Sequence, residues 1–189
     1  MPLSRPREAP RGLGVAPCGQ NERVTTASPL LVHDAIVRLD YGQFSLCGSP
    51  GRSGDYMTYL EAAIGGERIA GDDYGVVVLS PHQNNFRMPF RVELWDRRPP
   101  DDQAEWEEIF HCGLVVDNGG LHYQSPTMDE TVFDLPGGTY SLLICGRGFV
   151  NHGWPGSITP GDVWRVQMWP STDRRVPSRV KIWHQPASR

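Results

Sequence analysis

The sequence predicts an all-β protein, a single antiparallel β-sandwich of about eight strands with one short helix. Two observations support this fold class. The 189 residues include 21 glycines and 17 prolines, so the chain turns often. Between the turns, apolar residues stand in short runs rich in β-branched and aromatic side chains, as is typical of strands. Because this length suits one ordinary core, we expect one sandwich domain over residues 23–185.

The start of the chain has a different composition. Residues 1–22 contain proline, arginine and glycine without hydrophobic periodicity, which predicts a disordered tail. This segment lacks the apolar stretch of a secretory signal, and no apolar run in the chain approaches the length of a membrane span. We therefore expect a cytoplasmic protein that does not bind membranes.

The first half of the chain predicts three strand segments. Residues 31–40 and 41–47 fit either a long hairpin or one bent strand, with Gly42 as a candidate bulge. Residues 74–80 form a short apolar run that suits a buried strand.

Residues 55–66 predict the helix. Asp55 can accept hydrogen bonds from the first-turn amides, and Gly65 can take the left-handed position at the end. An apolar face at helical spacing would let the helix plug one end of the sandwich; its members are Tyr56, Leu60, Ala63 and Ile64.

Two longer strands follow. Residues 86–96 alternate between apolar and charged side chains, which predicts a half-exposed strand, and Pro89 places it near an edge or bulge. Residues 106–117 predict a further strand. Asn118-Gly119 is the strongest hairpin signal in the chain, so we expect this strand to pair with residues 121–125.

The C-terminal part predicts two core strands joined by a long loop. Tyr140 follows the turn 134–138 closely and is a candidate corner tyrosine, with its hydroxyl bonded back to the turn. Residues 139–145 are almost wholly apolar, and residues 162–169 alternate. A last strand is expected at 180–183.

The loop 146–161 is the first candidate partner-binding site. An irregular loop of this length is more often functional than merely connecting. It presents Arg147, Asn151, His152 and Trp154, and we expect Trp154 to be its exposed anchor. The alternative is that the Trp154 indole folds back and closes one end of the sandwich.

An acidic run is the second candidate. It combines Trp106 with five carboxylates: Asp101, Asp102, Glu105, Glu107 and Glu108. One interpretation is a solvated edge that discourages pairing between molecules. The other is a surface for a basic protein, formed by Glu105, Trp106, Glu107 and Glu108.

No motif in the chain predicts catalysis or a cofactor. Glycine spacing around 146–153 does not match a phosphate loop, and no serine or cysteine lies in a nucleophile motif. The six histidines lack metal-ligand spacing, although His111 and His122 would face each other across the predicted hairpin. A net charge of -4 disfavours a general nucleic-acid binder. We assign no catalytic residue, metal or cofactor.

Two of the cysteines and five of the six tryptophans are expected in the protein interior. Cys112 and Cys145 lie within apolar strand patterns and suit small buried positions. Five tryptophans fall in or beside strand patterns and are expected in the core, namely Trp95, Trp106, Trp164, Trp169 and Trp183.

Four segments in order resemble one known family. They are YGQF at 41–44, MPFRV at 88–92, GGLH at 119–122 and DLPGGTYSL at 134–142. Together they resemble the competence protein J family, small bacterial proteins that inhibit a DNA-entry nuclease. The resemblance implies a β-sandwich that binds and silences a protein partner.

We therefore predict a non-catalytic cytoplasmic binding protein, an inhibitor or immunity protein for a nuclease or toxin. Its expected partner is a basic protein, with no direct contact to nucleic acid. The competing hypothesis is a small-ligand module or an enzyme that uses the loop 146–161.

Overall fold

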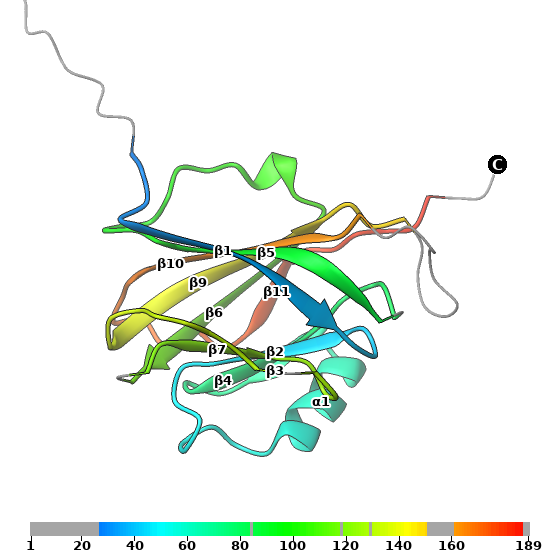
Figure 1. The fold of residues 1–189 in the computed structure, drawn as a ribbon, viewed down its shortest axis with the longest axis horizontal. Coiled ribbons are helices and arrows are strands. Elements are labelled where there is room, and N and C mark those ends of the chain that lie inside the picture. The colour runs from blue at the N-terminus through cyan, green and yellow to red at the C-terminus, as the bar shows by residue number, and fades with distance from the viewer. Residues whose placement is uncertain (1–26, 84, 118, 129, 151–160, 187–189) are drawn as a thin grey trace, which may run out of the picture.

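The computed structural model describes residues 27–83, 85–117, 119–128, 130–150 and 161–186. Its strands form two sheets stacked face to face, which confirms the predicted β-sandwich (Figure 1). The larger sheet contains, in spatial order, β1 (Leu31–Leu39), β5 (Phe86–Leu94), β10 (Val163–Pro170), β9 (Gly138–Arg147), β6 (Glu108–Val116) and β11 (Ser178–Lys181). The smaller sheet contains β3 (Ile69–Gly71), β4 (Gly75–Leu79), β2 (Gln43–Cys47), β7 (Leu121–Gln124) and β8 (Thr131–Phe133). The predicted tail at 1–22 lies outside the described residues.

The described part of the chain has eleven strands, more than the predicted eight or so. β3 and β8 have three residues each and β11 has four, too few for a period-two pattern to be detected. The β5–β10 pair is parallel, so the larger sheet departs from the predicted antiparallel arrangement at this one pairing.

Alternation along the strands builds the core between the sheets. On β5, Met88, Phe90 and Val92 are almost fully buried, while Arg87 and Arg91 face outward, as predicted. Pro89 precedes the first residue that pairs with β10, so its missing amide interrupts no bond on that side.

Phe44 joins the two layers. Its ring, on β2, lies 5.7 Å from that of Phe90 and 5.1 Å from that of Trp164, both on the larger sheet. Tyr123 stacks on the same ring at 5.4 Å. The five predicted core tryptophans are all buried, as are Cys112 and Cys145.

The corner tyrosine is also confirmed. The Tyr140 hydroxyl donates to the Pro136 carbonyl at 2.8 Å, which ties β9 to the turn before it.

The predicted hairpin at Asn118-Gly119 is wrong. β6 pairs with β9 and β11, whereas β7 pairs with β2 and β8 in the other sheet. Both sides of β6 are occupied by strands distant in sequence, so the chain crosses between layers here. His111 and His122 consequently lie in different sheets.

The helix α1 (Tyr56–Gly65) begins as predicted, because the Asp55 carboxylate accepts from the Thr58 amide at 2.8 Å. Its position differs from the prediction, since it packs against β3 and β4 on the outer side of the smaller sheet (Figure 1). Ile64 is 69% exposed, and the left-handed residue after the helix is Arg68, with φ 64°, rather than Gly65. β3 follows the helix closely in sequence and pairs with β4, which keeps the helix on this face of the sheet.

Candidate functional site

The loop 95–107 lies over the outer face of the larger sheet (Figure 1). It leaves β5 and returns to β6, so it passes over β10 and β9, which lie between them. A second hydrophobic cluster anchors it to the sheet, away from the main core. The cluster consists of Trp95, Trp106, Ile109, Leu143, Cys145 and Trp169.

Trp106, a predicted partner anchor, is buried in this cluster with 5% of its surface exposed. Two arginines stack on its ring. The guanidinium carbon of Arg165 lies 4.4 Å from the ring centroid, and that of Arg147 lies 4.7 Å away. Such stacking stabilises the indole in a site shielded from water.

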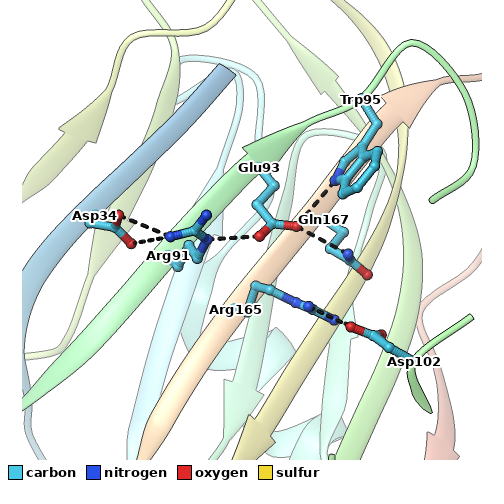
Figure 2. A network of polar contacts seen from close by, with 7 residues as sticks. All are labelled: Asp34, Arg91, Glu93, Trp95, Asp102, Arg165 and Gln167. Atoms are coloured by element: carbon cyan, nitrogen blue, oxygen red, sulfur yellow. Dashed lines mark hydrogen bonds and ion pairs between the residues drawn. The ribbon is translucent and has the colours of Figure 1, made fainter. Parts of the chain in front are cut away.

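Asp102 anchors the loop to β10 by a bidentate ion pair with Arg165 (Figure 2). The two N–O distances are 2.6 and 2.8 Å. The hydrogen bonds from Arg165 lower the pKa of Asp102 below its usual value. This carboxylate is therefore ionised at neutral pH and already paired within the chain.

The carboxylate of Glu107 accepts hydrogen bonds from the backbone amides of Gly148, at 2.7 Å, and Phe149, at 3.0 Å. Phe149 is buried and packs against Trp164 and Trp183 in the main core. Glu107 therefore fixes the first residues of the loop that follows β9.

Glu108 lies inside the protein. Its side chain is fully buried and accepts from Arg68 at 2.6 Å. Burial raises the pKa of Glu108 to about 7 in spite of that arginine. Trp106 and Glu108 are thus not part of the exposed surface, which corrects the predicted placement of these two residues.

The exposed members of the candidate surface are Glu105 and Arg147, whose side chains are 66% and 46% exposed. Their charged groups lie 3.9 Å apart, a long ion pair that water can screen. Asp101, earlier in the same loop, is also exposed. The other predicted members, Asn151, His152 and Trp154, lie outside the described residues.

A second polar network continues along the same sheet face (Figure 2). Arg91 donates to both oxygens of Asp34, at 3.0 Å each, and to Glu93 at 2.7 Å. The other oxygen of Glu93 accepts from Trp95 and Gln167, at 3.1 Å each. The period-two pattern of the sequence predicted that Arg91 and Glu93 share one face of the strand. It could not predict their partners on other strands, because these depend on the order of the strands in the sheet.

Ser80, His82 and Asp162 form a buried group at the base of the loop 146–161. His82 Nδ1 lies 3.0 Å from Asp162 Oδ1, and both side chains are fully buried. The Ser80 hydroxyl accepts from the His82 amide at 3.2 Å and donates to Asp162 at 3.5 Å. This buried contact ties the segment that follows β4 to the start of β10.

A small cavity lies on the outer face of the other sheet, beside α1. It measures about 180 Å³ and is lined by Cys47, Tyr59, His122 and Glu130, among others. This is below the roughly 300 Å³ at which drug-sized ligand pockets begin. Burial raises the pKa of the Cys47 thiol, which disfavours the reactive thiolate.

Within the described ranges, no three histidine, cysteine or acidic side chains gather as metal ligands. The single α-helix of this part of the chain is too short and too polar to cross a bilayer.

No protein family and no curated protein matches this sequence. Two solved structures resemble the fold. One is ComJ from Bacillus subtilis, described as an inhibitor of the DNA-degrading activity of NucA; it is 17% identical, with a TM-score of 0.52 over 77% of this chain and 98% of ComJ. The other is described as crocagin biosynthetic gene J, with 13% identity and a TM-score of 0.49 over 75% of this chain and 97% of that one. The resemblance to the competence protein J family is therefore confirmed at the level of the fold: this chain has a β-sandwich similar to that of ComJ.

Proposed function

We propose that this protein is a non-catalytic binding protein that inhibits a partner of the nuclease or toxin class. The observation that carries the proposal is the match to ComJ, which includes nearly the whole of that inhibitor. A shared fold does not by itself transfer activity.

The proposed contact surface is the outer face of the larger sheet around Glu105 and Arg147. A rigid base supports it, since Asp102 and Trp106 hold the loop 95–107 against β10. Rigid surfaces lose little conformational entropy on binding, which favours tight inhibition. The exposed Glu105 carboxylate would steer a basic partner toward this face.

The test begins with affinity purification from native lysate, followed by an activity assay on the recovered partner. We expect a stoichiometric protein whose cleavage of a fluorogenic oligonucleotide falls as the purified inhibitor is added back. A captured nuclease that stays fully active at saturation, or recovery of this chain with only a bound metabolite, would contradict the proposal.

A charge reversal then tests the surface. Glu105→Lys should slow association with that partner several-fold at low salt, because the change removes attraction and adds repulsion. The matched control is Glu61→Lys, an exposed position on α1 in the other layer. Equal effects of the two variants would mean that net charge, not this surface, governs association.

A further inference from the structure

Three outward-facing residue pairs lie in succession across β1 and β5. In the antiparallel register, Asp34 is opposite Arg91, Ile36 is opposite Pro89, and Arg38 is opposite Arg87. Side chains directly opposite each other in such a pair stand roughly 5 Å apart at Cβ. The face therefore presents an ion pair, an apolar pair and a pair of like charges.

The last pair is unusual because like charges directly opposite each other destabilise a sheet. Arg91 is held between Asp34 and Glu93 (Figure 2). The guanidinium groups of Arg38 and Arg87, in contrast, have no ion pair or hydrogen bond among the described residues. Both arginines are exposed. Two arginine side chains thus extend from directly opposite positions on this face, with no carboxylate partner among the described residues.

The surface at these pairs is hollowed. One depression of about 300 Å³ includes Asp34, Ile36, Pro89 and Arg91 in its lining. A second, of about 420 Å³, is lined by Ile36, Arg38 and Arg87 with two neighbouring residues. Ile36 lines both and is 55% exposed, so an apolar strip joins them.

We propose that these pairs form a docking groove for an extended acidic segment of a protein partner. An acidic side chain would accept hydrogen bonds from Arg38 and Arg87, and an apolar neighbour would cover Ile36 and Pro89. Guanidinium groups suit carboxylates because their planar N–H pairs match the two oxygens. The apolar pair Ile36–Pro89, which lies between the two charged pairs, matches the alternating side chains of an extended peptide and not a continuous chain of phosphates, which favours a peptide over nucleic acid.

This groove deepens the proposed function by naming the chemistry of one partner segment, but it can be tested separately. The probe is a short fluorescently labelled peptide of alternating glutamate and leucine, measured by anisotropy with the full chain. The test variant carries Arg38→Gln and Arg87→Gln. The matched control carries Arg97→Gln and Arg98→Gln, which removes the same charge from exposed positions of the loop 95–107.

We expect the test variant to bind the peptide about tenfold more weakly than the wild type, from two lost charge-assisted hydrogen bonds. The control variant should bind as the wild type does. A peptide with glutamine in place of glutamate should bind poorly, and added salt should weaken binding of the acidic peptide. The melting temperature of the test variant should stay equal or rise, because removing the arginines relieves repulsion.

Equal peptide affinity for the wild type and the test variant would overturn the groove. The proposal would also be overturned if a DNA duplex displaced the peptide from the wild type and bound the test variant more weakly, since the site would then bind phosphates. Failure of nuclease inhibition with intact peptide binding would reject the proposed function and leave the groove standing.

Discussion

Glu108 is the residue whose environment departs furthest from what its local sequence indicates. It ends an acidic run, yet it is fully buried beside Arg68, which adopts φ 64°. A non-glycine residue in that region is strained, and such strain persists where surrounding contacts fix the backbone. The hydrogen bonds from Arg68 to Glu108 and to the Leu79 carbonyl are contacts of this kind.

The raised pKa of Glu108 makes stability depend on pH. Between its ordinary value of 4.5 and the folded value of about 7, the unfolded chain releases a proton that the folded protein keeps. The contribution of Glu108 to the free energy of unfolding should therefore fall as pH rises through this window, by an amount on the order of 3 kcal/mol. Burial lowers the pKa of His111 to about 4, which acts in the opposite direction up to its ordinary value of 6.5, so the Glu108 contribution is measured as a difference between variants.

Across this window Glu108→Gln should gain stability relative to the wild type by this amount, because glutamine cannot titrate. Urea denaturation at several pH values measures it, with the exposed Glu105→Gln as the control that keeps the wild-type slope. If Glu108→Gln instead lost stability relative to the wild type as pH rose through this window, the ionised pair with Arg68 would dominate.

At the scale of elements, the loop 95–107 and the root of the loop 146–161 support each other. Glu107 belongs to the first and accepts two backbone amides of the second. The guanidinium group of Arg147, at the end of β9, stacks on the ring of Trp106. The position of the candidate surface therefore depends on contacts between segments about 40 residues apart.

Glu107→Ala should cost about 1 to 2 kcal/mol of stability, since it leaves the Gly148 and Phe149 amides without their carboxylate acceptor. Amide hydrogen exchange at these two residues should accelerate. Glu105→Ala, two residues earlier and exposed, is the control and should change neither quantity. Unchanged exchange in Glu107→Ala would mean that the carboxylate does not hold the loop root.

At the scale of the whole molecule, the two sheets are joined by one aromatic core. Trp164 is fully buried on β10 and contacts rings from both layers, including Phe44 and Phe110. Since truncation here leaves a large cavity between the sheets, Trp164→Ala should lower the free energy of unfolding by about 3 to 5 kcal/mol.

Chemical denaturation with the half-exposed Val132→Ala as a control measures this loss. The transition should remain a single step in both variants, because both sheets share this core. A loss below about 1 kcal/mol for Trp164→Ala would contradict a core that depends on this ring.

The sequence by itself determined the fold class, the capped start of α1, the corner Tyr140 and the inward faces of β5 and β10. These features depend on local chemistry: period-two alternation, a capping carboxylate and a turn next to an aromatic residue. Only the tertiary structure decided which strands are neighbours. Strand order in the larger sheet brings Arg38 to Arg87 and places Arg165 under the loop that carries Asp102, while the packing of the two sheets brings Arg68 to Glu108. The strand pairing also overrides the hairpin preference of Asn118-Gly119. The physical reason is that burial and charge pairing between distant segments outweigh the small free-energy preferences of a single turn.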